Sequence, residues 1–254
     1  NRNLTSAIIY TSPPLVSYYY ASIQYFFGKN EFILHTFFMA FSITAAVSMY
    51  YFSKKFTRWN VAAALLLIST PIFALTSHNF MHDLPMMAFF LLSVMAFAYG
   101  ADRDDKFLLI LSGLFIALTF FTKYNAIILF PLIIVYAFLR KKMRYSLYLA
   151  IPIFLTLIWF ANEWYHYGKV HVIRFFLGWH VTKTVSAGLA TKFLETIAPF
   201  AVSNLSNIGG ATIFFIFLVY PFMKQKKDFI LMIMLALINS LFAVLLYFKS
   251  SSFF

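Results

Sequence analysis

The sequence has no cysteine and few charged residues. The absence of cysteine excludes disulfide bonds, thiolate metal sites and thiol nucleophiles. Only 11% of the residues are charged, whereas 62% are hydrophobic, and the mean hydropathy is +0.81. A soluble domain of this composition would expose large apolar patches. The composition therefore predicts an all-α polytopic membrane protein, because helices satisfy their own backbone hydrogen bonds within lipid.

Acidic side chains are also scarce, with 8 Asp and Glu against 20 Lys and Arg. One of them, Asp83, lies in a short polar segment, residues 77–85, between two apolar runs, and this segment also holds His78 and His82. A carboxylate and two imidazoles at the mouth of a membrane segment are costly unless they are solvated or used. The segment is therefore the first candidate for a functional site.

Eight apolar segments are candidate membrane-spanning helices. A helix needs about 20 residues to cross the roughly 30 Å hydrocarbon core. Several candidates are shorter, so we expect their helices to continue into the loops or to lie in a thinned bilayer. The candidates are residues 33–53, 61–77, 84–101, 107–122, 125–139, 145–161, 208–223 and 229–248.

Residues 13–27 form a different kind of segment. Pro13 and Pro14 open an apolar, tyrosine-rich run that ends before Gly28. About 15 helical residues reach roughly 22 Å, which is short of the hydrocarbon core. We therefore predict a helix that lies in the external membrane interface and does not cross the bilayer.

The basic loops give the predicted orientation. If the spans alternate, four loops share one side and hold 12 of the 20 Lys and Arg residues: 54–58, 102–106, 140–144 and 224–227. The positive-inside rule makes this side cytoplasmic. Topology then accounts for the net charge of +12, and nucleic acid is dropped as a partner.

With this orientation, residues 1–32, 77–83 and 162–207 are external, as is Lys123. Apolar residues recur at helical spacing in the last of these segments, which predicts two amphipathic helices on the outer surface. Glu163 would be a solvated residue at the start of this loop. Three acidic residues on the opposite side are predicted to form a solvated turn: Asp102, Asp104 and Asp105.

Several short motifs follow one another in a characteristic order. Ser12-Pro13-Pro14-Leu15 precedes the tyrosine-rich helix, Lys54-Lys55 forms a basic turn, and Asp83-Leu84-Pro85 and Thr122-Lys123-Tyr124 follow. In their order and spacing, residues 12–139 resemble the GT-C-type membrane glycosyltransferases of the protein-O-mannosyltransferase and aminoarabinose-transferase-like family. Such enzymes take a sugar from a polyprenyl or dolichyl phosphate on the external or luminal side. They pass it to a lipid, a glycan or a protein.

The chain departs from this family in two places. Ser12 stands where the family usually has His or Lys, which removes a basic contact to the donor. The family also carries an acidic residue in its first external loop, and that loop would precede Asn1. We therefore expect the chain, residues 1–254, to be a fragment of a single transmembrane domain. The resemblance implies that the main catalytic carboxylate lies upstream and that Asp83 supports it.

Asp83 has two interpretations that do not exclude each other. It can cap the following helix, with Pro85 in the first turn, or it can be a site carboxylate that orients the acceptor, binds a metal or supports the base. His78 and His82 stand four residues apart, as metal ligands on one helix face do. Pro85 argues against a helix there and favours hydrated interfacial histidines. The sequence requires no cofactor and leaves a divalent metal open.

Lys123 also has two interpretations. At the external end of a span it can extend its ammonium to the interface, or it can pair with the donor phosphate and stabilise the leaving group. Arg174 is a further candidate for phosphate binding. The residues predicted to line the site are Ser12, Pro13, Pro14, His78, His82 and Tyr124.

The sequence thus predicts an inverting glycosyltransferase with a polyprenyl- or dolichyl-phosphate sugar as donor. Its membrane would be the plasma membrane of a prokaryote or the endoplasmic reticulum of a eukaryote, and membrane lipids are its other partners. The alternative is a non-catalytic membrane protein: a transporter, a lipid-handling partner or a pseudo-glycosyltransferase. A transporter would place ionisable groups near the middle of the membrane, and the predicted spans hold almost none.

Overall fold

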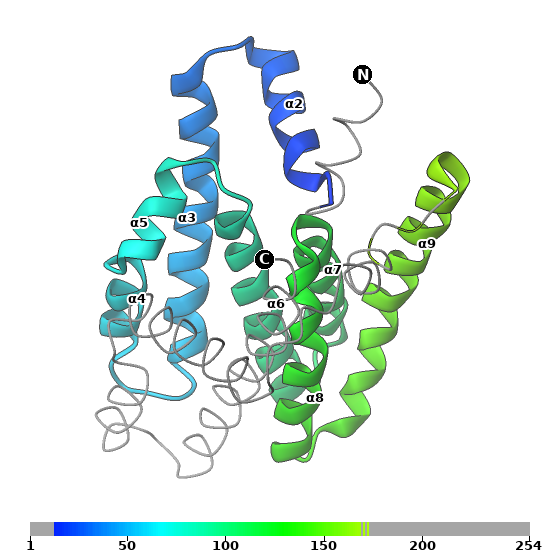
Figure 1. Cartoon of the computed structure of the whole chain (residues 1–254). Coiled ribbons are helices and arrows are strands. Elements are labelled where there is room, and N and C mark those ends of the chain that lie inside the picture. Colours follow the sequence, from blue (N-terminus) through cyan, green and yellow to red (C-terminus); the bar gives the residue numbers. More distant parts are fainter. Residues whose placement is uncertain (1–12, 169, 171, 173–254) are drawn as a thin grey trace, which may run out of the picture. The chain divides into compact units, whose positions relative to one another are not determined.

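The computed structural model describes residues 13–168, 170 and 172. The chain divides into two compact units, Asn1–His171 and Val172–Phe254, and all the helices named below belong to the first. Within the described residues every regular element is helical (Figure 1). In chain order these are α2 (Leu15–Phe27), α3 (Glu31–Ser53), α4 (Asn60–Ile68), α5 (Pro71–His78), α6 (Asp83–Arg103), α7 (Lys106–Thr122), η1 (Tyr124–Ile128), α8 (Leu129–Leu139), η2 (Met143–Leu149) and α9 (Ala150–Tyr167).

Helix α6 lies at the centre of this unit. Of its most apolar stretch 56% is buried, against 17% for α3 and 22% for the helix formed by η2 and α9. Helices α3, α7 and α8 pack against it. Its buried apolar residues extend from its first turn to its last: Leu84, Ala88, Val94, Ala96, Phe97, Ala98 and Ala101. Because α6 is held on several sides, its first residue, Asp83, has a fixed place.

Polar residues set where several of the helices begin. Asn30, Thr70 and Asp105 stand before α3, α5 and α7, and each side chain accepts a hydrogen bond from a backbone N–H in the first turn. Such caps satisfy donors that have no partner within the helix. The start points of these three helices are therefore encoded locally.

The predicted span 61–77 is a bent pair of helices. Helices α4 and α5 together are apolar enough to cross a membrane, but they meet at an angle of 57°. Pro71 has no backbone N–H to continue the hydrogen bonds of α4, and the Thr70 hydroxyl donates to the Leu67 carbonyl while it caps α5. The chain therefore breaks at Thr70-Pro71.

Small residues bring α7 close to its neighbours. A Cβ on Gly113 would lie 3.0 Å from Cβ of Ile151 on α9, and one on Gly100 of α6 would lie 3.0 Å from Leu109 on α7. Between α6 and α7, the buried Ser112 hydroxyl donates to the Ser93 carbonyl at 2.9 Å. Close backbone approach and hydrogen bonds between helices are how helices associate in lipid.

The described residues confirm the all-helical class and hold fewer full-length spans than the sequence predicts. Three helices are long and apolar enough to cross a membrane: Glu31–Ser53, Asp83–Arg103 and Met143–Tyr167. Counted as one span, the bent pair makes a fourth, while Lys106–Thr122 and Tyr124–Leu139 are shorter apolar helices. The predicted spans 208–223 and 229–248 and most of the predicted outer loop 162–207 lie outside the described residues. The total of eight spans stays a prediction.

Ion pairs gather three of the basic loops at one end of the unit. Lys55 pairs with Asp102, and Arg144 pairs with Asp104 at 2.7 Å. Asp105 caps α7. The acidic turn is solvated as predicted, since the side chains of Asp102 and Asp104 are 47% and 58% exposed, and its carboxylates also hold partners from the loops or the helix beside it.

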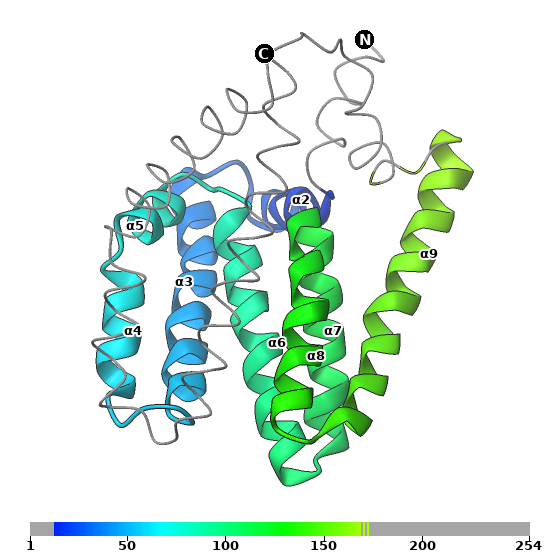
Figure 2. The same ribbon diagram turned by 60° about the horizontal axis from the view of Figure 1, so that its bottom comes forward.

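Helix α2 runs across the opposite end. Figure 2 views α2 nearly along its axis, level with the upper ends of the helices α3, α6 and α7, which run lengthwise in that view. The Tyr19 hydroxyl donates to the Phe37 carbonyl of α3 at 2.9 Å. An orientation across the bundle is the one expected of a helix in the membrane interface.

Candidate functional site

An ion pair joins the two residues that the sequence singles out as the site carboxylate and the site cation. Nζ of Lys123 lies 2.7 Å from Oδ1 of Asp83. Asp83 is the first residue of α6, and Lys123 follows the last residue of α7 in extended backbone conformation. The side chains are 42% and 28% exposed, respectively. The structure therefore brings together two residues that are 40 positions apart, at the end of the unit opposite the basic loops.

Asp83 does not cap α6. The N-cap position is His82, and no side chain hydrogen bond caps this helix. Pro85 lies in the first turn, as expected, where the missing N–H costs nothing. The cap interpretation is wrong because the carboxylate turns toward Lys123. Its negative charge still lies at the helix N-terminus, where the helix dipole favours it.

His82 lies beside this ion pair and is half-buried. Burial lowers the pKa of the His82 imidazole below 6.5, the Lys123 ammonium lowers this pKa further, and the Asp83 carboxylate opposes the shift. The imidazole is therefore neutral at pH 7, with one nitrogen available as donor and the other as acceptor.

His78 and His82 do not share a helix face. His78 is the last residue of α5 and is exposed, and residues 79–82 separate it from α6. Among the residues that the structure describes, no group of three or more His, Asp or Glu side chains could hold a metal ion. His78, His82 and Asp83 therefore do not form a three-ligand cluster.

Helix α2 contacts the loop that leads to Asp83. The Tyr20 hydroxyl donates to the Phe80 carbonyl at 3.1 Å. Pro13 and Pro14 stand at the beginning of α2, and the Pro14 carbonyl accepts from the N–H of Tyr18 in the first turn. The motif at the start of the described chain and the Asp83 segment thus lie at the same end of the unit.

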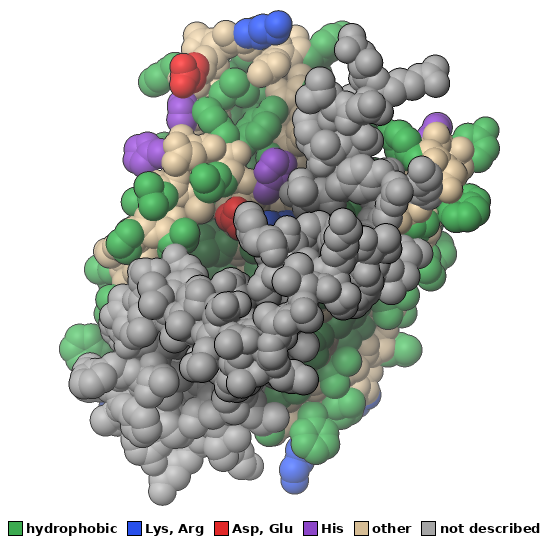
Figure 3. Space-filling view, viewed as in Figure 1, with side chains coloured by type: hydrophobic (Ala, Val, Ile, Leu, Met, Phe, Trp, Pro, Cys, Tyr) green, Lys and Arg blue, Asp and Glu red, His purple; other side chains and the backbone are tan. Residues whose placement is uncertain are grey.

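Polar side chains are unevenly distributed over the face shown in Figure 3. The visible acidic and histidine side chains lie in the upper half of that view, and hydrophobic side chains cover most of the visible flank of the described part. This is the distribution expected where a helical bundle meets lipid along its side and water at its end.

A comparison with protein-family models decides the family. The model described as dolichyl-phosphate-mannose-protein mannosyltransferase matches residues 11–166, which is more than half of the chain. The chain belongs to this family. A search of curated proteins and a search of solved structures found no significant match. Family membership confirms the resemblance and implies a membrane glycosyltransferase that uses a dolichyl-phosphate sugar donor.

Within the part matched by the family model, Glu163 differs from its prediction. Glu163 was predicted to be solvated at the start of an outer loop, but α9 continues to Tyr167 and the Glu163 side chain is fully buried. It accepts a hydrogen bond from the Tyr124 hydroxyl at 3.3 Å. The Glu-Trp-Tyr-His sequence that follows Asn162 is polar enough to indicate a loop, and only the contact with a residue 39 positions earlier reveals the burial.

Tyr124 and Lys123 are adjacent in the sequence, but their side chains make different contacts. Tyr124 is fully buried and packs against Phe120, at 5.4 Å between ring centroids, as well as reaching Glu163. Lys123 reaches Asp83. Tyr124 therefore anchors the junction of α7 and η1 from which Lys123 extends. It was predicted to line the site, and the structure gives it this anchoring contact.

Two predicted site residues lie outside the described residues. Ser12, the residue that departs from the family motif, and Arg174, the second candidate for phosphate binding, are among those for which the structure gives no placement. Their roles stay predictions.

Proposed function

We propose that this member of the family transfers a sugar from a dolichyl- or polyprenyl-phosphate donor to a lipid, glycan or protein acceptor on the external or luminal face. The observation that supports this proposal is the Asp83–Lys123 ion pair at the end of the bundle away from the basic loops. The family model supplies the donor class. The pair supplies a cation and a carboxylate where a lipid-linked phosphate enters from the membrane surface.

The proposed chemistry is an inverting displacement. The acceptor hydroxyl loses its proton to a carboxylate, its oxygen forms a bond to the anomeric carbon, and the bond from that carbon to the phosphate oxygen breaks. The lipid phosphate leaves with the negative charge. The Lys123 ammonium pairs with that charge as it develops.

Asp83 has a supporting part in this proposal. It holds the Lys123 ammonium in place through Oδ1 before the donor binds, and its second oxygen orients the acceptor hydroxyl. The family resemblance assigns the proton-accepting carboxylate to a residue other than Asp83. His82, neutral at pH 7, offers a further hydrogen bond beside the pair.

The site is tested by Asp83→Asn in the complete protein. We expect transfer of labelled mannose from dolichyl phosphate mannose, in isolated membranes, to fall at least about tenfold, because the amide no longer holds the ammonium by charge. A matched control is Asp104→Asn, which removes an exposed ion pair at the opposite end of the same unit. This control should keep wild-type transfer. Wild-type transfer by Asp83→Asn, at equal expression, would refute the assignment of Asp83 to the site.

The face of the membrane is tested separately. Asn79 and Lys141 are both exposed and lie at opposite ends of the unit. Cysteines introduced at these two positions should react with an impermeant maleimide from opposite sides of the membrane, with position 79 on the external or luminal side. Labelling of both from the same side would refute the proposed orientation.

A further inference from the structure

The loop between α5 and α6 contains a residue in a backbone conformation that its side chain disfavours. Phe80 has φ of +48°, a left-handed value that is uncommon for any residue other than glycine and is an outlier for a bulky one. Such a conformation persists only where the surrounding contacts hold it. Phe80 lies three residues before Asp83, so whatever holds Phe80 also sets the path of the chain into the site.

Three aromatic side chains from two other helices surround the Phe80 ring. The ring centroids of Tyr20 on α2 and Phe38 on α3 lie 5.6 Å and 5.3 Å away, and that of His35 lies 4.1 Å away. The Tyr20 ring stands at 83° to the Phe80 ring, an edge-to-face geometry that aromatic pairs favour. Phe80 also packs against the core formed by Phe38, Phe73, Leu84 and neighbouring residues.

The backbone of Phe80 is held as well as its ring. The Phe80 carbonyl accepts the Tyr20 hydroxyl at 3.1 Å. The residue is thus fixed from α2 through a hydrogen bond and a ring contact, and from α3 through ring contacts alone. All of these contacts come from the two helices and none from the loop itself.

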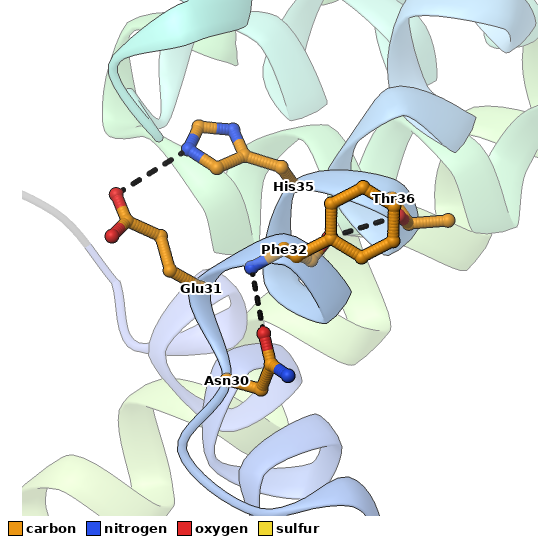
Figure 4. Close-up of polar contacts among 5 residues, drawn as sticks. All are labelled: Asn30, Glu31, Phe32, His35 and Thr36. Carbon is orange, nitrogen blue, oxygen red and sulfur yellow. Dashed lines mark hydrogen bonds and ion pairs between the residues drawn. The ribbon is translucent and has the colours of Figure 1, made fainter.

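The third ring, that of His35, has its own support. Nε2 of His35 lies 3.7 Å from Oε1 of Glu31, one helical turn earlier on α3 (Figure 4). Asn30 caps the same turn by accepting from the N–H of Phe32 at 2.9 Å. The first turn of α3 is therefore ordered by its own side chains, and it presents the imidazole to Phe80.

We propose that Phe80, Tyr20 and His35 are positioning residues for the site: they hold residues 79–82 in the conformation that delivers Asp83 to Lys123. This inference depends on the proposed function of the Asp83–Lys123 pair. It assigns a role to the tyrosine-rich helix α2 that its motif alone does not give, because Tyr20 joins α2 to the loop that carries the site. It also explains why a strained phenylalanine stands where glycine would be unstrained: glycine would lose all three ring contacts.

Tyr20→Phe is the sharpest test, because Tyr19→Phe is a matched control. Both substitutions remove one hydroxyl from α2 and one hydrogen bond to a carbonyl, but the Tyr19 bond goes to Phe37 of α3 and not to the loop. In the complete protein, we expect Tyr20→Phe to lower kcat of sugar transfer about two- to tenfold, the range that corresponds to one hydrogen bond. KM for dolichyl phosphate mannose should stay within about twofold. Tyr19→Phe should keep wild-type kcat, and Phe80→Ala should lower kcat more than Tyr20→Phe.

A second readout follows the loop without any assay of activity. Spin labels at positions 81 and 32, whose side chains are 44% and 79% exposed, report the distance between the loop and α3. The distance distribution should broaden in Tyr20→Phe and in Phe80→Ala, and it should stay as in the wild type in Tyr19→Phe. An unchanged distribution, or unchanged kcat, in both Tyr20→Phe and Phe80→Ala would overturn the inference. An inactive wild-type protein would contradict the proposed function, while the spin labels would still decide whether these residues hold the loop.

Discussion

Among single residues, Asp83 and Lys123 determine what the site can do. Both side chains are partly exposed, and ion pairs in such positions contribute only about 0–1 kcal/mol to stability. Replacing either residue should therefore leave the fold intact. Substitutions in this pair can therefore test function without disturbing the fold. Substitutions in the buried Tyr124–Glu163 contact cannot, because they would also affect folding.

His82 gives the site a predictable pH dependence. Its folded pKa is lowered by burial and by Lys123, so the unfolded chain, with a pKa of about 6.5, binds the proton more readily than the folded protein. The stability that the neutral imidazole contributes is present above pH 6.5 and is lost as the pH falls through the lower, folded pKa.

The prediction is tested with His82→Gln. Thermal unfolding of the purified protein, followed between pH 8 and pH 5, should show a smaller fall in Tm for His82→Gln than for the wild type. His78→Gln, an exposed histidine of the same segment, is the control and should match the wild type. Equal pH dependence of the wild type and His82→Gln would show that the imidazole is not held neutral.

Residue chemistry could be predicted from the sequence where it depends on charge and position along the chain. Asp83 and Lys123 were singled out because each is a charge at the end of an apolar run. The sequence did not predict that Asp83 would leave α6 uncapped. It also did not predict the burial of Glu163, which depends on a tyrosine 39 positions away. The left-handed backbone of Phe80 had no local signal at all, since its contacts come from α2 and α3.

Among the elements, the helix boundaries follow from local signals. Asn30, Thr70 and Asp105 cap their helices, and Pro71 explains the break between α4 and α5. Local signals do not predict how closely two helices approach each other. Gly113 is one of several small residues within apolar runs, and only the structure shows that it faces Ile151 of α9.

Gly113→Leu should therefore loosen the contact between α7 and α9. A side chain at this position meets Cβ of Ile151 at 3.0 Å and the Tyr148 carbonyl at 3.1 Å, and overpacking of this kind costs about 1–3 kcal/mol. We expect a lower Tm in detergent, with loss of transfer in proportion to unfolding. Leu114→Phe adds bulk at the next position, which is 39% exposed, and should leave Tm unchanged. A wild-type Tm for Gly113→Leu would show that the two helices separate without cost.

At the scale of the whole unit, the two ends of the bundle differ in kind. Three basic loops meet at one end through the Lys55–Asp102 and Arg144–Asp104 pairs. The other end carries α2, His82 and the Asp83–Lys123 pair. The alternation of spans that the sequence analysis assumed accounts for this division, because every second loop must lie at the same end. The composition predicted the membrane class for a separate reason: the chain has too few charged residues to cover the surfaces of its helices.

The central claim is that the carboxylate at the start of α6 and the ammonium just after the end of α7 act on a lipid-phosphate sugar, and are not merely a structural ion pair. Exchanging the two charges, with Asp83→Lys and Lys123→Asp in one protein, restores an ion pair but places the ammonium on the wrong helix. Measured as transfer of labelled mannose from dolichyl phosphate mannose in isolated membranes, the exchanged protein should be as inactive as Lys123→Ala, while the Tm of both variants stays close to that of the wild type. Wild-type transfer by the exchanged protein would contradict the account.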